Sequence, residues 1–191
     1  MSVVNSLYPI FLKTEQLQFL VVGGGKVALE KLTFLFRSSP NSKVRLIAPR
    51  IDDNTLTFIQ DKPVTWFKKN FEISDLKEVH IVICATNNTL LHRKIHQACR
   101  LQKILINVAD TPHLCDFYMG AIVTKGDLKI GISTNGKSPT LAKRIRQWLE
   151  QILPEDINES IALLQHYRKT LSGDFDQKIK SLNEITKSLL S

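Results

Sequence analysis

The sequence lacks any long apolar run, which argues against a membrane-spanning helix. Its longest apolar runs, Phe19–Val22 and Ile81–Ala85, are far shorter than the roughly 18–20 residues that such a helix needs. The start of the chain also lacks the basic region, apolar core and small-residue cleavage site of a signal peptide. We therefore expect a cytoplasmic protein with no membrane partner.

Cysteine is scarce, and the few residues present suggest neither disulfides nor a metal. Cys84, Cys99 and Cys115 are odd in number and form no CxxC pair, so we expect reduced, half-buried thiols. His92 and His96 have the spacing of metal ligands on a helix, but no Asp, Glu or Cys stands with them as a third ligand in the HExxH manner. We predict no metal site.

Charge of one sign is in excess. The 191 residues include 26 Lys and Arg against 18 Asp and Glu, which gives a formal net charge of +8. Such a field attracts anions, namely nucleic acid, anionic lipid or a polyanionic small molecule. The basic residues are spread along the chain rather than gathered in an aromatic-interleaved tract, so we expect no nucleic-acid partner. A carboxylate-rich substrate suits the same field.

The composition, with 43% hydrophobic and 23% charged residues, is that of a soluble globular protein with a sizeable core. Over the first 110 residues, short apolar runs alternate with segments of helical period, which indicates βα units around a parallel sheet. Helices are predicted around Ala28–Phe36 and Leu90–Arg100. Strands are predicted over residues 17–22, 44–48, 64–67, 80–85 and 104–109.

The pattern changes after Asp110. Two β-rich runs, residues 121–125 and 128–133, are separated by Gly126-Asp127, which predicts an antiparallel hairpin. Ser138 as N-cap and Pro139 as first helical residue then begin a further helix.

Pro154 ends that helix, and two apolar stripes of helical period follow, split near Gly173. The stripes are Ile157, Ile161, Leu164 and Leu171, then Phe175, Ile179, Leu182, Ile185 and Leu189. We predict an α/β fold with a Rossmann-type domain over residues 1–112, a central α+β region over 113–153 and a small helical domain over 154–191.

A glycine-rich loop is the most informative local feature. Gly23-Gly24-Gly25-Lys26-Val27-Ala28 has the GxGxxA spacing, follows a predicted strand and opens a predicted helix. In that setting Gly23 allows a tight turn, Gly25 lets the backbone approach a pyrophosphate, and Ala28 lets helix and strand pack closely. The phosphates then sit at the helix N-terminus. A glycine turn without ligand is the alternative, but the context favours a dinucleotide.

The acidic residue that binds the ribose of NAD, expected at the end of the second strand, is absent. The chain there reads Ala48-Pro49-Arg50. Either Asp52 substitutes from the loop, or the backbone of Pro49 and Arg50 contacts the adenosine, or the cofactor is NADP and Arg50 meets its 2′-phosphate. A solvated surface charge is the plain alternative for Arg50.

Ligands of open α/β sheets lie outside the carboxyl ends of the strands, which singles out Thr86-Asn87-Asn88 and Asp110. A carboxylate beside the expected nicotinamide can take the proton that leaves when a substrate gives up hydride. On local sequence alone, Asp110-Thr111-Pro112 is more often a turn. Ser138 is an N-cap by default, and its hydroxyl can instead face an anion beside Lys137.

Six stretches occur together in the order and spacing of one family, over about residues 1–150. They are Leu7–Leu12, Val21–Ala28, Ile83–Asn88, Ile106–Asp110, Leu114–Phe117 and Gly136–Pro139. Jointly they resemble the dehydrogenase module of sirohaem synthases, that is, precorrin-2 dehydrogenase.

The resemblance implies a homodimer with an N-terminal NAD-binding Rossmann domain and a central dimerisation region, residues 113–153, that includes the hairpin. It implies oxidation of precorrin-2 to sirohydrochlorin with NAD⁺ as cofactor, NADP not being excluded. The alternative is a bifunctional enzyme that also inserts Fe²⁺.

The family's essential aspartate falls on Asp110, the implied general base, and its serine, phosphorylated or in contact with substrate in some members, falls on Ser138. Residues implied to bind the cofactor are Gly23, Gly24, Gly25, Lys26, Val27, Pro49, Arg50, Thr86 and Asn87. Residues implied to bind the tetrapyrrole are Asn107, Lys137 and Ser138.

A different class of function stays open. In a non-catalytic regulator, the glycine loop would sense a dinucleotide, Asp110 would be a turn residue, and the basic helical tail would contact a partner or nucleic acid.

Overall fold

The computed structural model describes residues 5–171 and 175–187. They form two compact units, which are described separately. The first comprises the chain up to Met119 together with Asn135–Lys137, and the second comprises Gly120–Thr134 and the chain from Ser138 on. None of the helices in the described part of the chain combines the length and apolarity needed to cross a membrane.

A five-stranded parallel sheet forms the centre of the first unit. Its order is β3-β2-β1-β4-β5, and all neighbouring strands run parallel, as predicted. The strand bounds are β1 Gln18–Val22, β2 Lys43–Ile47, β3 Val64–Phe67, β4 Ile81–Cys84 and β5 Leu105–Val108. The chain runs from β1 outward to β3 and then returns to the other side of β1, so the switch point lies between β1 and β4.

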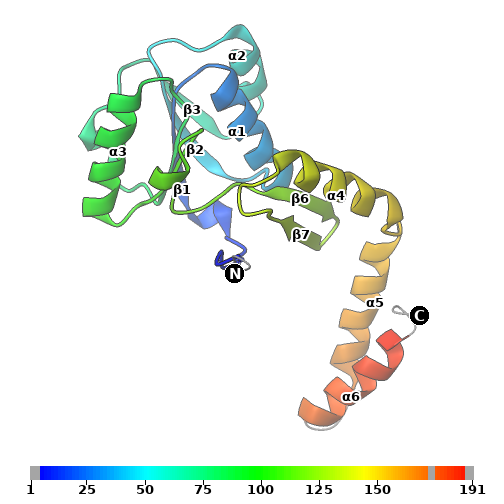
Figure 1. Cartoon of the computed structure of the whole chain (residues 1–191). Coiled ribbons are helices and arrows are strands. Elements are labelled where there is room, and N and C mark those ends of the chain that lie inside the picture. Colours follow the sequence, from blue (N-terminus) through cyan, green and yellow to red (C-terminus); the bar gives the residue numbers. More distant parts are fainter. Residues whose placement is uncertain (1–4, 172–174, 188–191) are drawn as a thin grey trace. The chain divides into compact units, whose positions relative to one another are not determined.

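Helices cover both faces of this sheet, with α1 (Lys26–Ser38) and α2 (Asp53–Ile59) on one face and α3 (Thr89–Gln102) on the other (Figure 1). Helices α1 and α3 are confirmed. The sequence did not predict α2, because it has seven residues and buries only Thr55 and Ile59. Three short 3₁₀ turns complete the unit: η1 Thr14–Gln16, η2 Ile73–Leu76 and η3 Pro112–Leu114.

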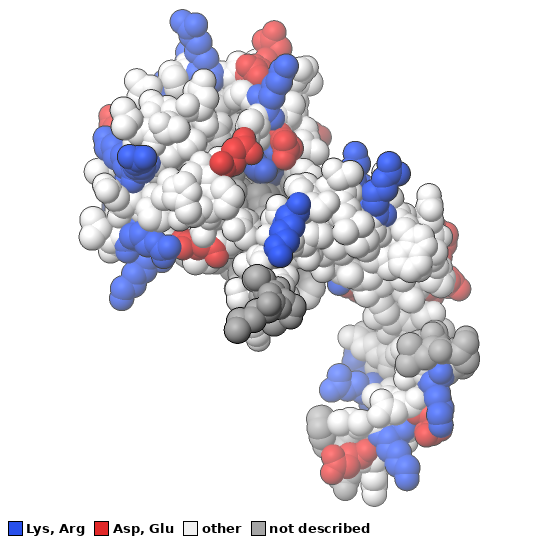
Figure 2. All heavy atoms as spheres, in the orientation of Figure 1, with Lys and Arg blue, Asp and Glu red and all other residues white. Residues whose placement is uncertain are grey.

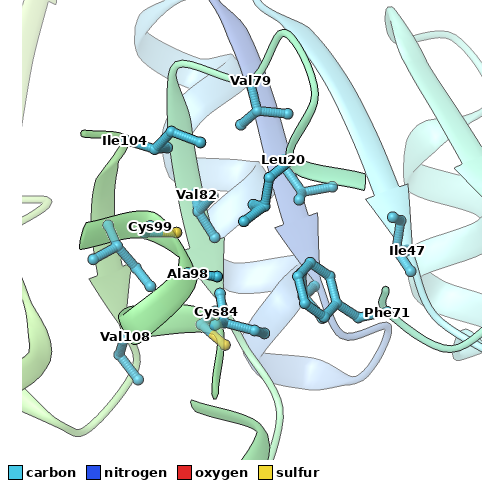
Figure 3. Close-up of a cluster of buried hydrophobic side chains, with 14 residues drawn as sticks. Leu20, Ile47, Phe71, Val79, Val82, Cys84, Ala98, Cys99, Ile104 and Val108 are labelled. Atoms are coloured by element: carbon cyan, nitrogen blue, oxygen red, sulfur yellow. The ribbon is translucent and has the colours of Figure 1, made fainter. Parts of the chain in front are cut away.

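Each face of the sheet has its own hydrophobic core, because successive strand residues point to opposite sides. Leu20 and Val82 pack toward Ala98 and Cys99 of α3 (Figure 3). The intervening residues, among them Val21, pack toward α1 in the second cluster. Burial on both faces explains why the strands read as continuous apolar runs.

The second unit contains the predicted hairpin, β6 (Ala121–Lys125) and β7 (Leu128–Ile132), followed by α4 (Pro139–Ile152). Ser138 is confirmed as the N-cap of α4, since its Oγ accepts a hydrogen bond of 3.2 Å from the Leu141 amide. The Lys125 ammonium donates to the Leu153 carbonyl over 2.6 Å, which ties the hairpin to the end of α4.

Two further helices follow, α5 (Ile157–Thr170) and α6 (Phe175–Thr186), and they correspond to the two predicted apolar stripes. Leu171 is the C-cap of α5 rather than a helical residue. The predicted split at Gly173 and the last stripe residue, Leu189, lie outside the described residues.

The structure groups the chain into two units, whereas the sequence predicts three segments. Residues 113–119 belong to the first unit, where Asp116 and Phe117 accept hydrogen bonds from Ile106 and Asn107 of β5. The assignment of residues 113–153 to dimerisation stays a prediction.

Candidate functional site

A cavity of about 870 Å³ lies in the first unit at the carboxyl ends of β1, β2, β4 and β5. Ligands of open α/β sheets bind at this place. All nine residues predicted to bind the cofactor line it, together with Asp110. Further lining residues are Val22, Ile47, Ala48, Asp52, Asn70, Phe71, Ala85, Thr89, Leu91, His92, Ala109 and Thr111.

Gly23 turns the chain where β1 ends, and only glycine fits there. Its φ is +118°, and a Cβ at this position would lie 2.3 Å from the carbonyl oxygen of Ala85, which follows β4. Its amide donates to the Ile47 carbonyl at the end of β2. The first glycine therefore lets the ends of three strands meet around the cavity.

Gly24 has a role that the sequence did not assign. A Cβ there would lie 2.4 Å from the Arg50 carbonyl oxygen. The Gly24 carbonyl accepts a hydrogen bond of 2.9 Å from the Asp52 amide. The second glycine thus packs the glycine loop against the segment that leads from β2 into α2.

Gly25 has open space where its side chain would be, so the protein itself does not require a glycine. Its backbone is extended, which any residue adopts, and a Cβ would meet only the Asp52 Oδ2, at 3.7 Å. Gly25 is also the N-cap of α1, and none of the side chains that the structure describes caps the first N–H groups of that helix. Open space beside unpaired N–H groups fits the close approach of a pyrophosphate.

Thr86 is held at the end of β4 by a buried histidine that the sequence analysis considered only as a metal ligand. His92 is 4% exposed, and its Nε2 lies 2.9 Å from both the Thr86 carbonyl oxygen and Oγ1. Because a carbonyl only accepts, Nε2 carries the proton. Nδ1 has no hydrogen-bond partner in residues 5–171 and 175–187.

His96, one turn further on α3, accepts a hydrogen bond of 3.4 Å from Arg100 instead of sharing a ligand with His92. Within the described residues, no group of three His, Cys, Asp or Glu side chains is arranged to hold a metal.

Asp110 lines the cavity directly after β5 and has a left-handed backbone, with φ +55°. Its neighbour Thr111 closes the turn by donating its amide to the Val108 carbonyl over 3.2 Å. An aspartate used only for a turn normally accepts a local backbone hydrogen bond with its carboxylate. Here the exposed carboxylate has no bonded partner among the described residues, so it is available to a ligand.

Asn107, predicted to bind substrate, is buried and does not line the cavity. Its exposed fraction is 6%, and its Nδ2 donates over 2.8 Å to the Phe117 carbonyl, which joins β5 to the segment that follows η3. Lys137 is exposed in the first unit, and Ser138 caps α4 in the second unit, so neither is a lining residue. Their contact with substrate stays a prediction.

The three thiols differ from the expectation of uniform half-burial. Cys84 and Cys99 are fully buried in the core on the α3 face, and burial raises the pKa of each to about 12. Cys115 is half-buried, as expected, and burial raises its pKa as well. All three are free in this structure and are neutral thiols at physiological pH.

Positive charge is dispersed over the visible surface. On the face drawn in Figure 2, Lys and Arg side chains stand singly or in small groups among acidic side chains. On this face the basic side chains form no single concentrated patch.

Comparison with known proteins gives two matching families. The family described as putative NAD(P)-binding matches residues 10–121, which is more than half of the chain, and the family described as sirohaem biosynthesis protein central matches residues 125–152.

Similar curated proteins include the sirohaem synthase of Ruthia magnifica subsp. Calyptogena magnifica, 36% identical over 87% of this chain and 35% of that protein. The sirohaem synthase of Psychrobacter cryohalolentis is 35% identical over 92% of this chain and 32% of that protein. The chain thus spans about a third of the length of these relatives.

Among solved structures, SirC, precorrin-2 dehydrogenase, has a TM-score of 0.75 and 23% identity, covering 94% of this chain and 89% of that one. This similarity supports the fold described above.

Proposed function

Because the chain belongs to the family of putative NAD(P)-binding domains and continues into the central segment of sirohaem biosynthesis proteins, we propose that it is an NAD-dependent precorrin-2 dehydrogenase. One observation carries the proposal most directly: the unpaired carboxylate of Asp110 lies in the same cavity as the glycine loop. A dinucleotide and a proton acceptor are the two components that this oxidation needs.

The glycine loop provides the binding site. The N-terminus of α1 would hold the pyrophosphate, and the missing Cβ of Gly25 would let it approach the backbone. Thr86 and Asn87 line the cavity just after β4, with Thr86 fixed by His92, and would hold the nicotinamide end of the cofactor. When bound, the nicotinamide supplies the hydride acceptor.

The substrate loses two hydrogens in the reaction. The hydrogen of one C–H bond leaves with the bonding electron pair as hydride, for which a bound nicotinamide would be the acceptor. A hydrogen on the neighbouring atom leaves as a proton to the Asp110 carboxylate. The electron pair left behind forms the new double bond, so atoms and charge balance. The protein supplies position and a base, not the redox group itself.

The overall charge suits the substrate, because precorrin-2 is rich in carboxylates and the protein carries a net charge of +8. This field steers a polyanion toward the protein. Lys137 and Ser138 are proposed to contact its carboxylates, whereas Asn107 contributes by holding β5 to Phe117.

We also propose a homodimer formed through the hairpin and α4. Three apolar side chains of α4, Leu141, Trp148 and Ile152, are 52%, 58% and 53% exposed in the single chain. Because about half of each side chain is already buried, covering the rest against a second copy is favourable by about 0.8–1.5 kcal/mol per side chain.

The test of the function is anaerobic incubation of the purified protein with precorrin-2 and NAD⁺, in which the tetrapyrrole spectrum and the NADH absorbance are followed together. Sirohydrochlorin and NADH should appear in equal amounts. A folded protein that binds NADH but produces neither would overturn the enzymatic proposal and favour a dinucleotide sensor.

The residues after β2 predict weak discrimination against NADP⁺. No acid stands at the end of this strand, and Arg50 is exposed, lines the cavity and has no charged partner in the described residues. A guanidinium–phosphate hydrogen bond contributes about 1.5–3 kcal/mol, so Arg50→Glu should lower kcat/KM with NADP⁺ by at least about tenfold. The value with NAD⁺ should change by less than about threefold.

The matched control is Arg93→Glu on α3, which makes the same charge change at an exposed residue outside the cavity lining. If both variants alter the NADP⁺ and NAD⁺ values equally, Arg50 acts only through the net charge and does not recognise the 2′-phosphate.

A further inference from the structure

β5 is an edge strand of the parallel sheet, so one side of its backbone has no neighbouring strand in the described part of the chain. Exposed edges of this kind leave N–H and C=O groups that need partners. In this protein the partners come from Cys115 and Asp116, which return past the strand after η3. Asp116 serves Ile106 with both of its groups: its amide donates to the Ile106 carbonyl over 2.7 Å, and its carboxylate accepts from the Ile106 amide over 3.0 Å.

Cys115 serves Val108 with a single atom. Its Sγ accepts from the Val108 amide over 3.2 Å and donates toward the Val108 carbonyl over 3.2 Å. The Thr111 carbonyl is a second acceptor at 3.4 Å. The thiol therefore bonds the amide and carbonyl groups of Val108 that a neighbouring strand would otherwise bond. Through Val108 and Thr111 it contacts both ends of the turn that carries Asp110.

The protonation state matches this double role. A neutral S–H can accept and donate at once, whereas a thiolate only accepts. Burial raises the pKa of Cys115, which keeps the proton that the carbonyl groups of Val108 and Thr111 need.

The turn between these contacts needs external support. Asp110 has φ +55°, a conformation that costs roughly 1–2 kcal/mol for a residue with a Cβ. Such a conformation persists only where the surrounding structure enforces it. The Thr111 amide donates to the Val108 carbonyl, the Thr111 hydroxyl donates to the Ala109 carbonyl, and the thiol of Cys115 links Val108 to Thr111; together these interactions hold the turn against the end of β5.

We propose that Cys115 is a positioning residue for Asp110: its thiol closes the loop from Val108 to Cys115 and thereby fixes where the Asp110 carboxylate meets the substrate. This inference rests on the proposed function for the role of Asp110, but the closure of the loop by the thiol is independent of it. The thiol itself does not touch substrate or cofactor.

The test compares Cys115→Ala, which removes both hydrogen bonds, with Cys115→Ser, whose hydroxyl accepts and donates in the same way. Misplacement of a catalytic group by about 1 Å costs up to about 100-fold in rate, so we expect kcat to fall about tenfold in the alanine variant with KM and NADH affinity unchanged. The serine variant should recover kcat to within about threefold of the wild type.

The control is Cys99→Ala, which makes the same substitution at a buried thiol in the core, away from the loop. It should lower the melting temperature and leave kcat unchanged. If Cys115→Ala behaves like this control, with lower stability and wild-type kcat, the thiol is only structural and the proposal is wrong.

Amide hydrogen exchange separates this proposal from the proposed function. Exchange at Val108 and Thr111 should accelerate at least tenfold in Cys115→Ala and stay near the wild-type rate in Cys115→Ser. If the wild type has no dehydrogenase activity, the proposed function fails, and the exchange rates still decide whether the thiol closes the loop. Unchanged exchange in the alanine variant would overturn the closure.

Discussion

Asp110→Asn is expected to lower kcat by a factor of about 10² to 10⁴, the usual contribution of a positioned general base. Turnover falls because the Asn amide cannot accept the proton. The affinity for NADH should stay within about twofold, because Asn has the shape of Asp and adds no bulk. Asn also tolerates the left-handed backbone of Asp110, so the turn is preserved. Steady-state turnover of precorrin-2, NADH fluorescence titration and thermal unfolding measure the three quantities.

Two comparisons make this result specific. Asp110→Ala should lose as much turnover but also lose about 1 kcal/mol of stability, because alanine adopts φ +55° less readily than Asn. Asp53→Asn removes the same charge at an exposed residue outside the cavity lining and should leave kcat unchanged. Wild-type turnover in Asp110→Asn would show that Asp110 serves only the turn.

Gly25→Ala is expected to weaken NADH binding by about 30- to 100-fold without destabilising the protein. The added methyl meets only the Asp52 carboxylate at 3.7 Å within the protein, but it would occupy the space through which we propose that the pyrophosphate reaches the α1 N-terminus. Stability should rise slightly, by up to about 1 kcal/mol, because alanine restricts the unfolded chain. NADH titration and chemical denaturation provide the two measurements.

Gly23→Ala adds the same methyl group but should have a different effect, so it serves as the comparison. Its methyl would lie 2.3 Å from the Ala85 carbonyl oxygen in a backbone conformation with φ +118°. We expect a loss of more than about 2 kcal/mol in the free energy of unfolding, with weaker NADH binding as a consequence of the distorted loop. Equal NADH affinity of Gly25→Ala and wild type would mean that the pyrophosphate does not approach Gly25.

Much of the fold follows from the sequence because the strands of this sheet are buried on both faces. Val21 and Val22 belong to an unbroken apolar run, and the turn residues after it give the strand a clear end. The hairpin and the start of α4 were equally readable, since Gly126-Asp127 and Ser138-Pro139 act locally. Helix α2 was not, because seven residues with two buried positions show no clear period.

The candidate site was predictable wherever a residue follows a strand, because the carboxyl ends of parallel strands share one edge of the sheet. This rule placed Thr86 and Asp110 at one cavity. The rule does not extend to Asn107, which lies inside β5 and donates to the Phe117 carbonyl, and whose contact with substrate stays a prediction from the family resemblance. The roles of Gly24 and Cys115 arise from contacts between segments that only the folded chain brings together.

The sealed edge of β5 also bears on association between chains. An open edge strand is a template on which another chain can add a strand, which is the first step toward β-aggregation. Cys115 and Asp116 already bond the amide and carbonyl groups of Val108 and Ile106. A strand of a neighbouring molecule therefore cannot pair with β5 at these two residues. The few residues after β5 therefore cover this strand edge against β-pairing between chains and also close the turn that carries Asp110.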